Sequence, residues 1–175
     1  DFVGMDQVIP NNYTELNLNW DIQSPQQEKG ADNEKNYTTV AYKYYQDEVD
    51  DLRARANDEA DEELNTRVKW IAMKQQFFSS ILVADKYFTN SQVQFQTLDD
   101  SKKYLKRLKA EMGVPYKSEP NYKVPMSFYF GPNHYNTLKK YGHNFENIIN
   151  LGWAIFKWVN KYIIIPIFNW LDDSI

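Results

Sequence analysis

The sequence contains no cysteine and only two histidines, His134 and His143, among its 175 residues. Without cysteine the chain can form no disulfide, no thiolate metal site and no cysteine nucleophile. No Asp, Glu or Cys lies near either histidine at a spacing typical of metal ligands. We therefore expect no metal and no cofactor, and an ordinary surface or capping role for both histidines.

The sequence also lacks the short motifs that accompany common enzyme chemistry. No G-x-S-x-G, Walker loop or G-x-G-x-x-G is present, so the usual marks of nucleophilic, phosphoryl and dinucleotide chemistry are missing. Two N-x-T sequons occur at Asn12 and Asn36, but this pattern is short and chance explains it. We predict that the chain is not an enzyme.

A leader segment is missing as well. The chain begins at Asp1 without an initiator methionine, and no basic and apolar signal follows. This start predicts a segment of a longer protein, with a membrane region following the chain. The length suits one domain with a buried core, and a second domain is not expected.

Negative charge is concentrated in one stretch, Asp47–Leu64. It holds nine acidic residues against two arginines, in a chain whose net charge is −4. No Gly-centred calcium loop is present, so the stretch is interpreted as a solvated loop or surface helix. Such an acidic surface makes nucleic acid an improbable partner.

Alternating apolar and polar residues predict strands in the first half of the chain. Glu15–Ile22 places Leu, Leu, Trp and Ile on one face, and Tyr37–Gln46 alternates in the same way. The stretch between them, Ser24–Asn36, has a turn composition. We therefore predict a hairpin with a long loop. Val68–Ala84 is interpreted as a strand, a kink at Gln75–Phe78 and a second strand.

The second half continues with strands and ends in helices. Gln92–Thr97 alternates, and Leu105–Val114 fits both helical and strand spacing, of which we choose strand. Val124–Phe130 alternates again, with Pro125 at an edge or a strand start. Asn133 is expected to cap a short helix that runs through Tyr141 and is closed by Gly142. Strands first and helices last predict a mainly β domain.

Aromatic residues make up 16% of the chain, which is enough for a carbohydrate-stacking surface or a peptide cleft. Most of them are expected in the core, because Tyr-rich strands pack well in a sheet. A ligand groove remains an open alternative.

The segment Leu151–Leu171 is apolar and aromatic, unlike the polar remainder of the chain. A helix of this length would reach about 30 Å, but two lysines and Pro166 argue against a clean span. Trp and Tyr rings suit the headgroup boundary, so we predict an amphipathic helix in the membrane interface, with a buried core helix as the alternative. The residues expected at the interface are Trp153, Phe156, Trp158, Tyr162 and Trp170, with Lys157 and Lys161 on the polar stripe.

Two sequence stretches carry a resemblance to a known family. The first, Val68–Ala84, reads VKWIAMKQQFFSSILVA. The second is Phe128–Leu171, in which Tyr129–Pro132 reads YFGP and Leu151-Gly152-Trp153 opens the amphipathic segment. In this order and spacing they resemble the large periplasmic domain of bacterial membrane protein insertases of the YidC/Oxa family.

The resemblance implies an antiparallel super-β-sandwich of the galactose-mutarotase type, incomplete here because such domains are larger. It implies part of the sandwich at residues 1–131, a short helical connector at 132–150 and an interfacial helix at 151–175. The catalytic residues of sugar enzymes with this fold have no counterpart in the chain.

By the same resemblance, the fragment faces the periplasm and belongs to a multi-pass protein of the cell inner membrane. Implied partners are nascent membrane proteins and the Sec translocon, SecD, SecF and SecYEG, and an open sheet edge could also drive dimerisation. The alternatives are a free-standing carbohydrate-binding β-sandwich and, less favoured, a mutarotase-like enzyme.

Overall fold

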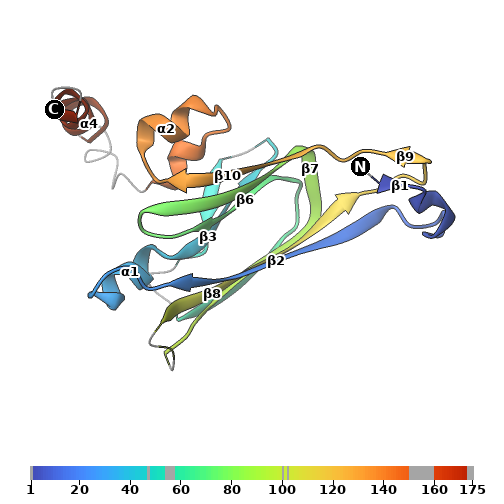
Figure 1. Cartoon of the computed structure of the whole chain (residues 1–175), viewed down its shortest axis with the longest axis horizontal. Helices are drawn as coiled ribbons and strands as arrows, with labels where there is room; N and C mark the ends of the chain where they lie inside the picture. The colour runs from blue at the N-terminus through green and yellow to red at the C-terminus, as the bar shows by residue number, and fades with distance from the viewer. Residues whose placement is uncertain are drawn as a thin grey trace.

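Antiparallel strands dominate the computed structural model, and short helices follow them towards the C-terminus (Figure 1). The structure describes residues 2–46, 48–53, 58–99, 101, 103–149 and 160–172. The strands are β1 Phe2–Val3, β2 Glu15–Pro25, β3 Thr39–Tyr44, β4 Val49–Asp51, β5 Glu59–Leu64, β6 Val68–Lys74, β7 Phe78–Thr97, β8 Tyr104–Pro115, β9 Asn121–Tyr122 and β10 Met126–Pro132. The helical elements are η1 Met5–Gln7, α1 Ala31–Tyr37, α2 Tyr135–Lys140, η2 Phe145–Ile148, η3 Asn160–Ile164 and α4 Ile165–Asp172.

The long strand β7 belongs to two sheets. Its first part lies between β6 and β10, in an upper sheet of order β10-β7-β6-β3-β4. Its second part lies between β8 and β5, in a lower sheet of order β2-β8-β7-β5. The pairing register shifts between Thr89 and Gln92, and Asn90 adopts a φ of 42°. A bulge of this kind bends a strand, so β7 leaves one sheet and enters the other.

The main core lies between the two sheets, as expected for a sandwich. Its members are inward residues of the strands, together with Leu52 just after β4, which confirms the mainly β, antiparallel, sandwich-like prediction. The buried residues are Val40, Tyr42, Leu52, Leu64, Val68, Ile71, Met73, Leu82, Ala84, Phe88, Val93, Phe95, Leu108, Ala110, Met112 and Val114.

A second apolar layer covers the outer face of the upper sheet, where α2 and η2 lie (Figure 1). Strand β6 is therefore buried on both faces: Trp70 and Ala72 point to the helices, while Ile71 and Met73 point to the main core. This double burial explains why the apolar run of β6 shows no polar side.

Strand pairing differs from the prediction for the first half of the chain. The predicted hairpin of Glu15–Ile22 with Tyr37–Gln46 is wrong, because β2 pairs with β8 and β3 pairs with β6 and β4. The segment between them crosses from the lower sheet to the upper one, and it contains helix α1 in place of a plain loop. The buried Glu34 carboxylate of α1 accepts the backbone N–H groups of Gln27 and Glu28, which closes this crossing.

The acidic stretch is also different from the prediction of a loop or surface helix. Its described residues form β4 and β5, and β5 is an edge strand that pairs with β7. Glu59, Asp61 and Glu63 alternate to the exposed side. Glu62 points the other way and accepts a hydrogen bond of 2.8 Å from the Tyr42 hydroxyl. Charged side chains on an edge strand discourage pairing with other chains, which explains why a strand tolerates this composition.

The predicted capping role of Asn133 is wrong. Helix α2 begins at Tyr135 with His134 at its N-cap, while the Asn133 amide donates to the Gln75 carbonyl and accepts from the Ser79 hydroxyl, both at 2.7 Å. Asn133 thus ties the end of β10 to the turn between β6 and β7. The predicted end of the helix is confirmed, because Gly142 follows it with a φ of 79°.

Lys106 of β8 is a buried cation. Only 1% of the residue is exposed, and its Nζ lies 4.0 Å from the centre of the Phe95 ring. Burial lowers the pKa of Lys106 from 10.5 to about 8, although Asp58 raises it, and Lys35 lowers it further. The folded protein therefore holds this proton more weakly than the unfolded chain does.

The free energy of unfolding should consequently increase as the pH rises above about 8. Above a pH of about 8 the folded state releases the Lys106 proton before the unfolded state does, so the free energy of unfolding should gain about 2 kcal/mol between about pH 7.5 and 9.5. Urea denaturation of wild type and of Lys106→Met over this pH range measures the gain. It is the change with pH in the difference between their free energies of unfolding. Lys29→Met, at an exposed lysine, should keep the rise, and an equal rise in Lys106→Met would contradict the assignment.

Candidate functional site

The segment expected at the membrane interface is helical where the structure describes it. Residues 160–164 form one π-helical turn, η3, and α4 follows. Tyr162 is 58% exposed and Trp170 69% exposed. Trp153, Phe156, Lys157 and Trp158 lie outside the described residues, as does the side chain of Lys161.

Helix α4 and the turn before it present apolar side chains to solvent. Between Tyr162 and Leu171 the sequence has no charged residue. The exposed apolar residues here include Ile163, Ile164, Ile167, Phe168 and Trp170. A contiguous apolar surface of this kind marks an interaction site. Among the described residues, no helix is both long and apolar enough to cross a bilayer.

The short helices before this segment are fixed to the upper sheet by Trp70. The Trp70 indole N–H donates to the His143 carbonyl at 2.8 Å, and the ring packs edge-on against Phe145 at 5.6 Å. Burial lowers the pKa of the His143 ring. Trp70 is fully buried, so the backbone at His143 and the ring of Phe145 are joined to the sandwich through a core residue.

The local geometry at the end of β10 explains the glycine of the YFGP sequence. The Tyr129 ring folds over Gly131, and its hydroxyl donates to the Pro132 carbonyl at 2.8 Å. A Cβ on residue 131 would lie 2.6 Å from the Tyr129 hydroxyl oxygen, which is closer than real Cβ contacts. Position 131 therefore requires glycine as long as Tyr129 makes this bond.

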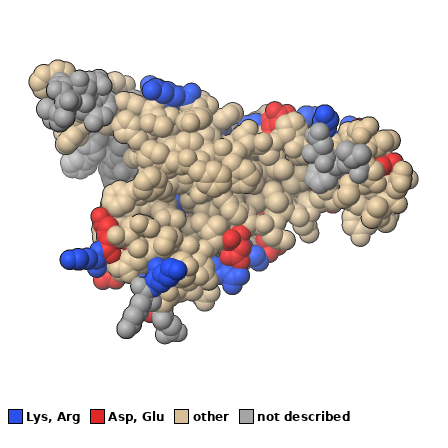
Figure 2. All heavy atoms as spheres, in the orientation of Figure 1, with Lys and Arg blue, Asp and Glu red and all other residues tan. Residues whose placement is uncertain are grey.

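An aromatic face lies where the two sheets open, and we define it by Trp20, Phe78, Phe128 and Phe130. Phe78, Phe128 and Phe130 are 58%, 55% and 69% exposed. Phe128 stacks on Phe130 and meets Trp20 edge-on at 5.7 Å. Figure 2 shows few charged side chains over β10 in this view, while red and blue side chains gather lower down, at the level of β2 and β8.

The aromatic face exists because β10 and β2 are edge strands. Among the described strands, β10 pairs only with β7 and β2 only with β8. The apolar residues of β2 reach the main core but stay only partly buried. The sequence places Trp20, Phe128 and Phe130 on strand faces and Phe78 in the predicted kink, but it does not indicate the side on which the sandwich is open.

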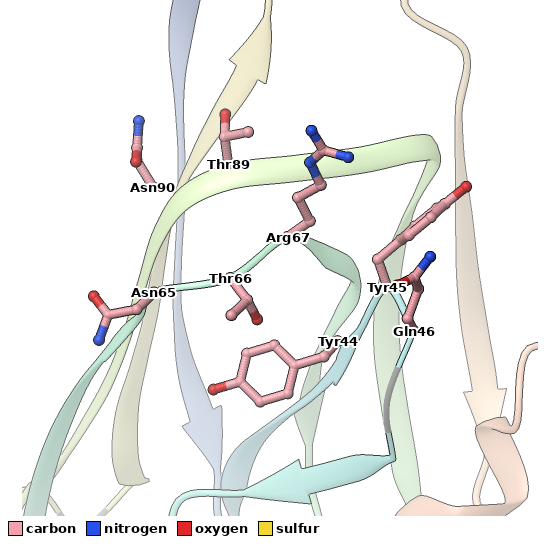
Figure 3. A pocket seen from close by; sticks show the side chains of 8 residues that line it. All are labelled: Tyr44, Tyr45, Gln46, Asn65, Thr66, Arg67, Thr89 and Asn90. Atoms are coloured by element: carbon pink, nitrogen blue, oxygen red, sulfur yellow. The ribbon is translucent and has the colours of Figure 1, made fainter.

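A pocket of about 490 Å³ lies at one end of the sandwich (Figure 3). It is formed where the end of β3, the turn between β5 and β6 and the bulge of β7 meet. Its lining side chains are Tyr44, Tyr45, Gln46, Asn65, Thr66, Arg67, Thr89 and Asn90. No sequence motif predicted this pocket, because three separate segments supply it.

Three observations bear on metal and acid–base chemistry. Among the described residues, no group of three or more His, Cys, Asp or Glu could hold a metal ion. His134 sits at the start of α2, where its Nδ1 lies 3.0 Å from the Thr137 hydroxyl. His143 packs against Phe145. Both histidines are exposed, as expected for a surface role, but the His134 side chain makes no capping hydrogen bond although the residue stands at the N-cap of α2.

Comparisons with known proteins agree on one family. The sequence profile of the YidC periplasmic domain matches residues 6–166. The chain is 35% identical to a membrane protein insertase YidC from Bacteroides fragilis and 34% identical to one from Phocaeicola vulgatus, in each case over 97% of this chain and 28% of that protein. A relative of the same name from Parabacteroides distasonis is 32% identical over 98% of the chain. The chain thus spans less than a third of the length of these relatives.

Proposed function

Because the chain belongs to the YidC periplasmic domain family, we propose that it serves as the periplasmic part of a membrane protein insertase. In this role it performs no catalysis itself. It aids insertion and folding of inner-membrane proteins by holding the membrane-embedded part of the insertase in position. The observation that carries the proposal is the exposure of the apolar side chains of Tyr162, Ile163, Ile164, Ile167, Phe168 and Trp170. They follow a connector that is anchored to the sandwich at His143 and Phe145.

The positioning role rests on an anchor within the connector and on exposed rings beyond it. Within the connector, His143 and Phe145 contact Trp70 of the upper sheet. Beyond it, in α4, Phe168 and Trp170 expose apolar rings that suit the headgroup boundary. Residues 151–175 then lie along the membrane surface as an interfacial helix, residues 132–150 act as its connector, and residues 1–131 form part of the sandwich.

The interface helix as predicted includes residues beyond the described part. Trp153, Phe156 and Trp158 belong to its apolar side in this proposal, and Lys157 and Lys161 to its polar side. A lysine can place its ammonium group among lipid headgroups while its methylene stem stays in the apolar layer. The arrangement matches a helix that lies on a membrane better than one that crosses it.

Partners of the domain follow from its exposed surfaces. The aromatic face offers apolar rings to a nascent membrane protein or to a periplasmic part of the Sec translocon, SecD, SecF or SecYEG. The open edges of β2 and β10 support completion of the sandwich by further strands, which another part of a longer protein or a second copy would supply.

Cells depleted of their own insertase test this function. They would express an insertase that carries this chain as its periplasmic domain, either unchanged or with Ile167, Phe168 and Trp170 replaced by serine. Protease accessibility of a newly made inner-membrane protein reports its insertion. We expect the unchanged chain to support insertion and the triple variant to reduce it strongly, because the membrane part loses its fixed position.

Two controls separate function from folding. The purified triple variant should keep the unfolding curve of the parent, since the three side chains are exposed. Substitutions at Val8 and Tyr13, which are 77% and 54% exposed, should leave insertion unchanged. Normal insertion by the triple variant would contradict the positioning role, and binding to glycans without binding to vesicles would favour a free-standing carbohydrate module.

A further inference from the structure

The pocket in Figure 3 has an unusual lining for a sandwich of this composition. Two tyrosines, two asparagines, two threonines, a glutamine and an arginine line it, with neither an aliphatic nor an acidic side chain among them. The amides and hydroxyls can each donate and accept hydrogen bonds. The tyrosine rings supply the only broad apolar surfaces.

The side chain of Arg67, which is part of this lining, is held in place by a neighbouring aromatic ring. Its guanidinium carbon lies 4.3 Å from the centre of the Tyr87 ring, and Tyr45 meets Tyr87 edge-on at 5.6 Å. The Tyr45 backbone N–H donates to the Arg67 carbonyl at 2.8 Å, which ties the two loops of the pocket together. A stacked arginine loses little further freedom when it binds an anion.

The opposite side of the pocket is also fixed. The Asn90 amide donates to the Glu15 carboxylate at 3.1 Å, and the Thr89 hydroxyl donates to the same group. Asn90 itself has the positive φ that marks the bulge of β7.

This chemistry selects one class of ligand. Hydroxyl groups of a sugar pair with amides and hydroxyls in both directions, and the C–H face of a sugar ring packs on an aromatic ring. An apolar peptide side chain would find no aliphatic subsite here. The pocket volume of about 490 Å³ lies within the range of small-molecule sites.

We propose that this pocket binds a small acidic saccharide, with the sugar hydroxyls on Asn65, Thr66 and Gln46, and the anionic group on Arg67. The Glu15 carboxylate lies behind Thr89 and Asn90 and repels an anion on that side of the pocket, so the anionic group belongs at Arg67. The site uses neither the aromatic face nor α4, and it therefore goes beyond the insertase role.

Protein-observed NMR on the whole chain tests the proposal. The ¹⁵N-labelled chain is titrated separately with glucuronic acid, glucose 6-phosphate, glucose and acetate. We expect shifts in the backbone signals of residues 44–46, 65–67 and 89–90 with at least one of the two acidic sugars, and weaker binding of glucose. The comparison of carboxylate with phosphate identifies the anionic group.

Arg67→Gln should weaken binding of the acidic sugar by about tenfold, the equivalent of one charge-assisted hydrogen bond. Asn65→Ala should weaken glucose and the acidic sugar alike. Lys86→Gln is the matched control, because it removes the same charge from an exposed position next to Tyr87 but outside the pocket lining. It should leave the affinity unchanged.

Three results would overturn the proposal. The first is an absence of shifts in the pocket with both acidic sugars. The second is an affinity for acetate equal to that for glucuronic acid, because the pocket would then bind any small anion. The third is an unchanged affinity in Arg67→Gln. None of these results bears on membrane protein insertion, so the insertase role is tested independently.

Discussion

Replacing Phe168 and Trp170 together by serine is expected to lower the affinity of the chain for lipid vesicles by about a hundredfold or more. The two rings are 66% and 69% exposed in the protein alone. Burying a large apolar side chain in the interface stabilises the bound state by about 1.5 to 3 kcal/mol. The loss of both rings therefore removes about 3 to 6 kcal/mol of binding free energy, with no loss of folding core.

Co-sedimentation with vesicles of zwitterionic and anionic lipid measures this change. The matched control replaces Val8 and Tyr13 by serine, which removes similar exposed apolar area near the N-terminus. That variant should bind vesicles as the parent does. If the Phe168 and Trp170 variant bound equally well, the segment would pack on protein and not on lipid.

Trp70→Ala should lower the free energy of unfolding by about 3 to 5 kcal/mol, the range measured for large aromatic residues removed from a core. Trp70, on β6, is fully buried beneath the short helices. The substitution leaves a cavity, removes the packing against Phe145 and leaves the His143 carbonyl without its indole partner. It also releases the connector from the sandwich.

Urea denaturation followed by circular dichroism gives the free energy. Trp70→Phe keeps most of the ring but loses the N–H, so its cost should be smaller, about 1 to 3 kcal/mol. Phe130→Ala, at a residue 69% exposed on the same sheet, should cost less than either. A Trp70→Ala variant as stable as the parent would mean that the short helices do not depend on this contact.

Alternation along single strands was predictable because it is a local property. The ambiguous stretch Leu105–Val114 shows the reason: its period of two matches a half-buried strand, and β8 covers it. The break near Gln75–Phe78 was equally visible, but the predicted kink is in fact the turn of an antiparallel hairpin, in which Lys74 of β6 pairs with Ser79 of β7. The resemblance to the family used these same local sequences, and the comparisons confirmed it.

Pairing between distant strands was not predictable from the same patterns. Glu15–Ile22 indicates a strand, but nothing in it specifies β8 as the neighbour instead of β3. The acidic stretch was wrongly predicted as a loop or surface helix for a related reason: an edge strand can be as polar as a loop. The pocket near Arg67 depends on three turns that meet only after β7 bends, so no single stretch of sequence signals it.

The shared strand β7 makes the molecule one cooperative unit. Neither sheet can unfold without disrupting β7, which is also an internal strand of the other sheet. Heating or denaturant should therefore unfold both sheets in a single transition. The first part of β7 also pairs with β10, so a change of the bend at Asn90 would affect both sheets. A pulling force applied to the C-terminal end of β10 would accordingly be resisted by the sandwich as a whole.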